Sequence, residues 1–427
     1  MPRSWLKIIW LTLFAISIGM FELPAEPEKK YEPEEYFRNF EEFVQVVKEI
    51  QNKYVVDEIE LKELLKNAYR GMLSGLDPYS QFIDSENLEE LKIETEGQFD
   101  GLGIEVVVKN GILTVLTPIV DSPAFRAGVL IGDRIVKING KSTKNITIRE
   151  ATKMLRGKTH TTVTLTVVHE GENEPKDIMI ERGKIHVMSI RGSRIVDEDY
   201  KIGYIAVTNF QENTIADLDL ALEDLLQQGM ESLILDLRFN PGGLLNVAVE
   251  MADRFVKKGV IVSTKGRHQS QNHEYKAHGS GTLPLFPLII LVNNGSASAS
   301  EIVAGAIKDH KRGLLLGTKT YGKGSVQSLI PIVERNSALK LTTARYYTPS
   351  GAQIDHKGIK PDVKVSLSKS EVRELYAYLS RINAKDIRVE NAEDESDEKT
   401  DFVDLQLVRS IEILKGIKIY AGIAESE

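Results

Sequence analysis

Two short segments of the chain contain a serine and a lysine that could act together as nucleophile and base. Ser298 lies at a loop-to-helix junction in the run N-N-G-S-A-S-A-S-E, and Lys323 lies between two glycines in Y-G-K-G-S-V-Q. A serine hydroxyl is inert until a neighbouring base takes its proton. A lysine can be that base if burial lowers its pKa from about 10.4 toward about 7–8. The pair therefore indicates acyl transfer through a nucleophilic serine.

Ser298 also fits a purely structural role. With Glu301 it forms the S-x-x-E pattern of a capping box, in which the serine only caps the helix that follows. Ser296 and Ser300 flank it and are rival nucleophiles on spacing alone. The start of a helix favours negative charge, which suits a site where an oxyanion develops. The residues alone leave these alternatives open.

Gln327 is placed to orient the lysine amine. If residues 324–329 form a strand, Lys323, Ser325 and Gln327 share one face of it. An amide there can hydrogen-bond the amine without adding a negative charge, which would raise the pKa of the lysine. The alternative is a solvated lysine in a loop.

The histidines do not offer a better base. His310 lies twelve residues along the helix from Ser298, and this corresponds to roughly 18 Å. Three further histidines lie in a polar stretch that we expect to be a solvent loop: His268, His273 and His278.

A second chemical motif is D-L-R-F-N-P-G-G, residues 236–243, which follows an apolar strand. Gly242 and Gly243, at the C-terminal end of that strand, can expose backbone N–H groups to a ligand. An ordinary strand-to-helix turn is the alternative.

Alternating strands and helices surround both motifs between about residues 185 and 367. The apolar runs at 233–237 and 288–292 are typical of a buried parallel sheet. The alternation predicts an α/β layered domain. The remaining expected elements are strands at 202–207 and 314–316 and helices at 214–228, 244–255 and 298–308.

From residue 97 to 181 the pattern changes to short strands. The runs S-P-A-F-R-A-G (122–128) and G-D-R-I-V-K-I-N-G (132–140) predict a short helix closed by glycine and a strand with an Asn-Gly turn. Gly101 and Gly103 can turn successive N–H groups toward one point. Such a nest captures a terminal carboxylate, and the strand after it can pair with an extended peptide. A tight turn without a ligand is the alternative.

Helical segments flank these domains. Apolar residues at helical spacing predict helices at 36–50 and 61–73. The tail predicts helices at 370–381 and 403–416, separated by an acidic stretch, 391–399.

The N-terminus is typical of an export signal. Arg3 and Lys7 accompany the start of an almost wholly apolar run, residues 8–21. This run is short for a membrane span and has the length of a signal core. We expect it to be cleaved or to stay as a membrane anchor.

Composition narrows the function classes. A chain of 427 residues is too long for one ordinary core, so two or three domains are expected. The net charge of −8 argues against nucleic-acid binding. The absence of cysteine excludes disulfides, thiolate catalysis, zinc–thiolate sites and a lipoprotein anchor.

The runs at 122–128 and 132–140 resemble those of a PDZ domain. The serine and lysine motifs, with N-P-G-G and G-I-K-P-D-V (358–363), resemble those of the carboxy-terminal processing (tail-specific) serine peptidases. The resemblance covers roughly residues 36–370. It implies an α/β multidomain fold with a crotonase-like α/β catalytic core, an inserted PDZ domain and helical N- and C-terminal segments.

The same resemblance implies roles for the catalytic residues. Ser298 would be the nucleophile, Lys323 the general base and Gln327 the residue that orients the base. The oxyanion hole would use backbone N–H groups from these positions: Ala299 and either Gly242 or Gly243.

In the PDZ domain, the resemblance implies that Leu102, Gly103 and Ile104 bind the carboxylate of a peptide. Arg156 would be a relay between the PDZ domain and the core. The expected parts of the chain are a signal or anchor (1–25), a helical dimerisation segment (26–96), the PDZ domain (97–183), the peptidase core (184–368) and the C-terminal helices (369–427).

The expected function is a serine endopeptidase that cleaves exported proteins near their C-termini through an acyl-enzyme. Its substrates would be proteins or peptides with a free C-terminus. The enzyme would be periplasmic, or extracytoplasmic and membrane-associated. The resemblance implies a homodimer that needs no metal or cofactor and binds no nucleic acid. Two alternatives are a catalytically inactive PDZ scaffold and a crotonase-like acyl-transfer enzyme. The intact Ser, Lys and Gln argue against the first, and the PDZ domain against the second.

Overall fold

The structure is a computed structural model that describes residues 33–56, 58–109, 111–119, 121–169, 171–332, 336–385 and 402–425. The predicted export signal and the acidic stretch at 391–399 lie outside the described residues. The chain divides into two compact units, residues 1–71 and 72–427. Within the described ranges, no helix combines the length and the apolar character that a membrane span requires.

The two predicted N-terminal helices are present as α1 (Pro33–Lys53) and α2 (Leu61–Ser74). The apolar residues of α1 recur at helical spacing and are exposed; they include Tyr36, Phe37, Phe40, Phe43 and Val44. Exposed aromatic side chains on one helix are typical of a segment that packs against another protein surface.

A largely parallel sheet forms the centre of the second unit. Its order is β10-β11-β12-β15-β16-β19, and only β10 runs antiparallel to its neighbour. Every residue of β12 and β15 is buried, as the apolar sequence runs predicted. The bounds are β10 (Ile190–Asp197), β11 (Ile202–Val207), β12 (Ser232–Asp236), β15 (Leu288–Val292), β16 (Leu314–Gly317) and β19 (Val363–Lys364).

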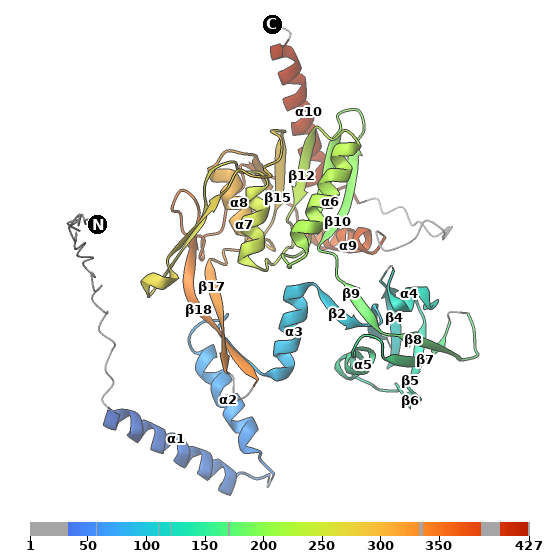
Figure 1. Cartoon of the computed structure of the whole chain (residues 1–427), viewed down its shortest axis with the longest axis vertical. Helices are drawn as coiled ribbons and strands as arrows, with labels where there is room; N and C mark the ends of the chain where they lie inside the picture. The colour runs from blue at the N-terminus through green and yellow to red at the C-terminus, as the bar shows by residue number, and fades with distance from the viewer. Residues whose placement is uncertain are drawn as a thin grey trace, which may run out of the picture. The chain divides into compact units, whose positions relative to one another are not determined.

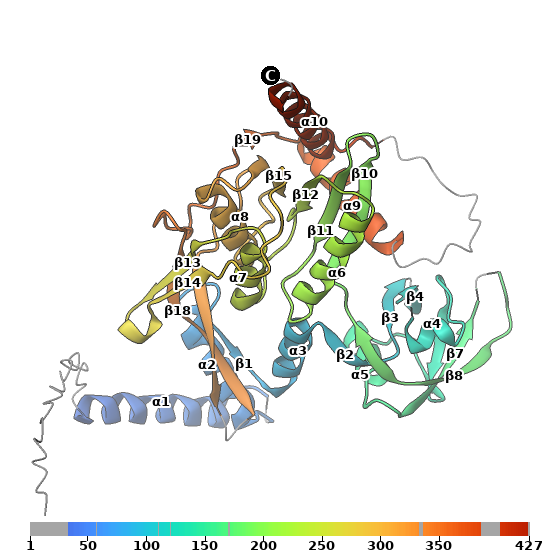
Figure 2. The ribbon, with the colours of Figure 1, turned by 45° about the horizontal axis from the view of Figure 1, so that its top comes forward.

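Helices cover both faces of this sheet. On one face, α6 (Thr214–Gln227), α7 (Leu245–Asp253) and α8 (Ala299–Asp309) bury their apolar sides against alternate strand residues. On the other, α10 (Leu405–Glu425) packs through Leu414. Figures 1 and 2 show this layering. The predicted α/β layered core is confirmed, and its crotonase-like character stays a prediction. Helix α9 (Lys369–Lys385) precedes α10.

A second sheet, in which all pairings are antiparallel, follows the lysine motif. Its order is β1-β18-β13-β14, and β17 also pairs with β18. The bounds are β1 (Gln81–Ile83), β13 (Gly259–Gly266), β14 (His273–Ala277), β17 (Ser325–Ile332) and β18 (Ser337–Tyr347), with the 3-10 turn η1 (Gln269–Gln271) between β13 and β14. The stretch containing His273 was expected to be a loop, but the structure places it in β14, because its backbone pairs with β13.

The β-rich segment is a separate small barrel-like sheet with its own core. The sheet order is β3-β4-β5-β7-β8, with β6 paired to β5. Strands β2 (Gln98–Gly101) and β9 (Gly183–His186) pair where the chain enters and leaves this segment, which makes it an insertion. The bounds are α3 (Ser85–Glu96), β3 (Ile104–Lys109), β4 (Ile112–Pro118), α4 (Pro123–Arg126), β5 (Arg134–Ile138), β6 (Lys141–Ser142), α5 (Ile148–Leu155), β7 (Thr162–Val168) and β8 (Lys176–Glu181).

Candidate active site

Ser298 is the N-cap residue of α8 and forms the predicted capping box with Glu301. Its backbone, however, is not that of an ordinary cap. An N-cap normally lies in the β region, whereas Ser298 has φ 55° and ψ −113°. A non-glycine residue in such a conformation is strained, and strain of this kind clusters at functional sites. Capping alone therefore does not account for Ser298.

The two rival serines are occupied. Ser296 and Ser300 are both fully buried, at 0% exposure. The Ser296 hydroxyl donates to the Leu237 carbonyl oxygen (2.7 Å), and the Ser300 hydroxyl donates to the Asn240 carbonyl oxygen (3.0 Å). Ser298 instead lines a cavity of about 790 Å³. Of the three serines, only Ser298 is thus presented to a space that could admit a substrate.

Lys323 and Gln327 line the same cavity as Ser298. The rest of its wall is mixed. Its apolar residues include Leu88, Leu91, Phe210, Val326, Leu329 and Tyr346, and its charged residues are Lys92, Glu94, Glu96, Glu212 and Lys340. None of the described residues lining it is a histidine. His310 lies at the C-cap of α8, where its Nε2 is 2.7 Å from the Val260 carbonyl oxygen.

The side chain of Glu301 joins the serine and lysine segments. Its Oε2 accepts hydrogen bonds from the backbone N–H groups of Ser298 (3.0 Å) and Lys323 (2.8 Å). Its Oε1 accepts from the Gly322 N–H (2.7 Å) and from the Thr320 hydroxyl. Glu301 is fully buried, and this burial raises the pKa of its carboxyl against the opposing effect of these hydrogen bonds. A single carboxylate therefore fixes the backbones of both proposed catalytic residues.

The surroundings of Lys323 act mainly against its charged form. Burial, with a further contribution from the like charge of Lys340, lowers the pKa of Lys323, while Glu301 acts in the opposite direction. The amine does not contact the Ser298 hydroxyl here: Nζ lies over the Tyr79 ring, 5.0 Å from its centroid. In the described part of the chain, no hydrogen bond joins the two functional side chains.

Gln327 does not make the contact that its spacing suggested. Its Nε2 donates to the hydroxyls of Ser325 (2.8 Å) and Thr342 (3.3 Å) rather than meeting the amine of Lys323. A bulge in the β17–β18 pairing between Val326 and Gln327 breaks the regular alternation that placed Lys323 and Gln327 on one face. The prediction of a direct Gln327–Lys323 hydrogen bond is therefore wrong for this structure.

The N-P-G-G turn lies directly beside Ser298. A Cβ added to Gly242 would meet the Ser298 Cβ at 2.8 Å, so only glycine allows this approach. The Gly242 N–H already donates to Asn240 Oδ1 (2.9 Å). No hydrogen bond of the described chain uses the N–H of Gly243 or Ala299 as its donor. In the described chain, the N–H groups of Gly243 and Ala299 thus have no acceptor, whereas that of Gly242 is already bonded.

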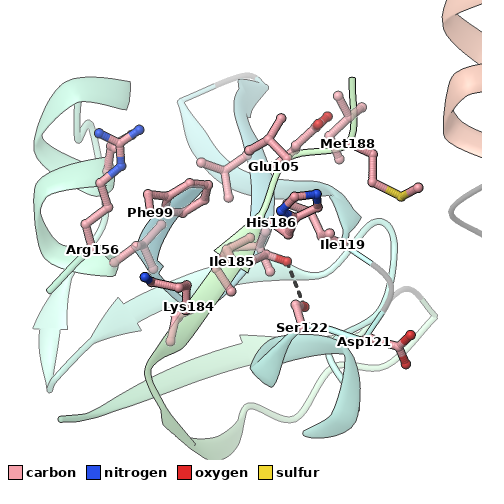
Figure 3. A pocket seen from close by; sticks show the side chains of 18 of the residues that line it. Phe99, Glu105, Ile119, Asp121, Ser122, Arg156, Lys184, Ile185, His186 and Met188 are labelled. Atoms are coloured by element: carbon pink, nitrogen blue, oxygen red, sulfur yellow. Dashed lines mark hydrogen bonds between the residues drawn. The ribbon is translucent and has the colours of Figure 1, made fainter. Parts of the chain in front are cut away.

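The inserted segment contains a groove of about 750 Å³ (Figure 3). It lies between β3, the edge strand of the sheet, and helix α5. Lys184, His186 and Met188, from β9 and the residues after it, also line the groove. A peptide in this groove would therefore touch the strand that leads into the core.

The turn before β3 suits a carboxylate. Gly103 has φ 76°, and a Cβ there would lie 2.2 Å from the Ser122 Cβ. The Ser122 hydroxyl donates to the Gly103 carbonyl oxygen at 3.0 Å (Figure 3). In the described loops and turns, the N–H groups of Leu102 and Gly103 donate to no acceptor. Gly101 was expected to share in the nest, but it lies in β2, where it pairs with Gly183.

Arg156 follows α5 and lies over the ring of Phe99 in β2, with its Cζ 5.1 Å from the ring centroid. Figure 3 shows the two side chains together at one side of the groove. Because β2 pairs with β9, Arg156 contacts the ribbon that connects the insertion to the core. Its relay role stays a prediction.

Comparison with known proteins agrees with this arrangement. The model of peptidase family S41 matches residues 201–365, and a PDZ domain model matches residues 114–168. A carboxy-terminal-processing protease of Bartonella bacilliformis is 43% identical over 333 residues, which are 77% of this chain and 75% of the relative. The chain belongs to peptidase family S41.

Two further proteins are similar to this S41 peptidase. A probable CtpA-like serine protease of Staphylococcus aureus is 40% identical over 314 residues, covering 72% of this chain and 61% of the relative. The solved photosystem II D1 C-terminal processing protease is 28% identical with a TM-score of 0.44, covering 76% of this chain and 92% of that one. The S41 peptidase is a serine-type enzyme with a PDZ domain, as its sequence predicted.

Sequence reasoning missed two functional features of this S41 peptidase. Glu301 was recognised only as a capping residue, because its S-x-x-E spacing does not reveal its bonds to the lysine loop. Tyr79 was not recognised at all, although the breaking sequence G-L-D-P marks the turn in which it lies.

Proposed function

We propose that this S41 peptidase is an endopeptidase that cleaves exported proteins near their C-termini with Ser298 and Lys323 as its catalytic pair. The observation that carries the proposal is the strained Ser298, which faces the same cavity as Lys323 while Glu301 fixes both backbones. The name of the Bartonella relative, a carboxy-terminal-processing protease, supports cleavage near the C-terminus.

The proposed reaction has two steps. The Ser298 Oγ attacks the scissile carbonyl carbon while its proton passes to the neutral Lys323 Nζ. The oxyanion accepts hydrogen bonds from the N–H groups of Gly243 and Ala299, and the Lys323 ammonium then protonates the leaving amine. Water next attacks the acyl-enzyme and gives a proton to Lys323, which returns it to the departing Ser298 oxygen.

A serine-reactive fluorophosphonate tests the nucleophile. We expect peptide mapping to locate the label on Ser298, because Ser296 and Ser300 are buried and hydrogen-bonded. Ser298→Ala should abolish labelling and casein digestion, whereas Ser300→Ala, the matched buried serine of the same helix, should keep both. A label on another serine, or undiminished labelling of Ser298→Ala, would contradict the proposal.

We also propose that the PDZ groove captures the substrate C-terminus at Leu102, Gly103 and Ile104. Charge-assisted hydrogen bonds to a carboxylate contribute about 1.5–3 kcal/mol each. A peptide with a free C-terminus should therefore bind roughly 10–100-fold more tightly than its amidated form, as measured by fluorescence anisotropy.

Gly103→Ala should remove this preference, since the added Cβ would collide with Ser122. Gly140→Ala is the control in the same domain, because Gly140 also has a positive φ (75°) but has nothing within 4 Å of its added Cβ. Equal affinity of the wild type for the free and the amidated peptide would contradict carboxylate binding by the PDZ groove.

The apolar N-terminal run after Arg3 and Lys7 supports a proposed extracytoplasmic, membrane-associated location. The exposed aromatic side chains of α1 support a proposed homodimer.

A further inference from the structure

The turn at Asp77–Ser80 is tightly built against the strands that carry the lysine motif. The Asp77 carboxylate accepts from the N–H groups of Tyr79 (2.8 Å) and Ser80 (2.9 Å) and from the Ser80 hydroxyl (2.7 Å). Thr342 of β18 donates to Asp77 Oδ1 through its hydroxyl (3.2 Å) and to the Ser80 hydroxyl through its N–H (3.1 Å). The turn is therefore fixed in place relative to β18.

The turn is linked to two residues that line the cavity of Ser298, Gln327 through Thr342 and Lys323 through Tyr79. Gln327 Nε2 donates to the same Thr342 hydroxyl (3.3 Å) that bonds to Asp77. The amine of Lys323 lies over the face of the Tyr79 ring, with Nζ 5.0 Å from the centroid. That distance is within the range of a cation–π interaction.

A cation–π interaction acts on only one protonation state of the amine. The negative face of an aromatic ring attracts an ammonium and has no such attraction for a neutral amine. A general base, however, must be neutral and within hydrogen-bond reach of the hydroxyl whose proton it takes. The contact with Tyr79 therefore belongs to a form of Lys323 that cannot deprotonate Ser298.

We propose that Tyr79 is a positioning residue that holds the protonated amine of Lys323 away from Ser298 in the resting enzyme. The inference rests on the proposed function of Lys323. On deprotonation the amine loses its attraction to the ring and is free to turn toward Ser298. The Lys323 N–H is bonded to Glu301 (2.8 Å), and the flexible four-carbon side chain beyond it lets the amine turn about its own bonds.

The charged and titratable groups around this contact come from several elements. Lys340 of β18 and Glu301 of α8 act on Lys323, the first favouring the neutral amine and the second the ammonium. Burial, followed by a hydrogen bond with Tyr321 and the charges of Asp355 and Glu301, raises the pKa of Tyr79 to about 12. Tyr79 therefore stays a neutral phenol over the range in which the lysine loses its proton.

The test is the pH dependence of Ser298 labelling in the full chain. The rate of reaction with a fluorophosphonate rises as Lys323 deprotonates, so its midpoint reports the apparent pKa of the lysine. Tyr79→Leu keeps an apolar side chain against the amine but removes the ring face. We expect its midpoint to move to lower pH by about half to one unit, with labelling roughly 3–10-fold faster below the midpoint.

Tyr79→Phe is the matched control, since it keeps the ring face and loses only the hydroxyl. Its midpoint should stay with that of the wild type. Thermal unfolding checks that each variant is folded, and Tyr79→Met is a second apolar replacement if leucine does not fit. An unmoved or raised midpoint in the folded apolar variants, or the same shift in Tyr79→Phe, overturns the inference.

Lys323→Met separates this inference from the proposed function. If Lys323→Met labels as fast as the wild type at every pH, the catalytic pair itself is wrong and the role of Tyr79 falls with it. If Lys323→Met labels slowly while the midpoint of Tyr79→Leu does not move, only the role of Tyr79 is overturned.

Discussion

Replacing Lys323 by methionine lowers the rate of peptide-bond cleavage by roughly 10²–10⁴-fold, the usual contribution of a general acid–base group. Methionine has a similar length but cannot take the proton of Ser298 or give one to the leaving amine. The measurement is kcat/KM on an unstructured protein such as casein. Lys319→Met, an exposed lysine of the same loop region, is the control and should leave the rate close to that of the wild type.

The loss of activity in Lys323→Met should not come from unfolding, and the pH dependence of stability gives the reason. Burial lowers the pKa of Lys323 below its ordinary value of 10.5. Between the lowered pKa and 10.5 the unfolded chain binds more protons than the folded chain, so wild-type stability rises with pH in that window. Below that pH window the lysine is charged in the folded chain, and the burial of its ammonium lowers the free energy of unfolding. Methionine removes this buried charge. Lys323→Met should therefore unfold at the same temperature as the wild type or higher at pH 7, and this advantage should shrink toward pH 10.5. A fold weakened by Lys323→Met would contradict the pKa direction.

Replacing Asp404 by alanine destabilises the peptidase core by about 3–5 kcal/mol, the usual cost of breaking a buried ion pair. Asp404 accepts two hydrogen bonds from Arg238, one from Nη1 (2.9 Å) and one from Nη2 (2.7 Å). The Arg238 side chain is 0% exposed and also pairs with Asp236. Asp404 further accepts from the N–H groups of Gln406 and Leu407 at the start of α10. Alanine removes the acceptor of the Gln406 and Leu407 N–H groups and leaves Arg238 with Asp236 and the Gln406 Oε1 as its remaining partners.

Urea unfolding of the core measures this effect. Arg409→Ala is the matched control on the same helix, because Arg409 and Glu412 form an exposed pair whose loss should cost no more than about 1 kcal/mol. Arg238 lies just before the N-P-G-G turn, so activity of Asp404→Ala should fall before the fold is lost. A change in stability no larger than that of Arg409→Ala would show that the ion pair contributes nothing to holding α10 on the sheet.

Local sequence patterns predicted the layered core. The buried strands β12 and β15 follow from unbroken apolar runs, which depend on short-range sequence alone. Ser298 and Lys323 were candidates on their residue types, but their neighbours left a helix cap, two rival serines and a solvated lysine as alternatives. The resemblance to a known family selected them, and the structure places both at one cavity.

Contacts between distant segments could not be predicted in this way. Arg238 and Asp404 are 166 positions apart, and nothing near either residue indicates the other. Sequence alone does not reveal that the Asn240 side chain accepts a hydrogen bond from the N–H of Gly242. The orientation of Gln327 depends on a bulge in β17. Each is decided by backbone geometry or tertiary pairing, which a pattern of residue types does not encode.

The carboxylate of Glu301 does not hold the two segments in the same way. Because Glu301 lies on α8, its bond to the Ser298 N–H stays within the start of that helix. A fluctuation that pulls the lysine loop away would therefore break only the bonds from the N–H groups of Gly322 and Lys323. The serine segment is thus the fixed part of the site, and the lysine segment is the part whose alignment depends on Glu301.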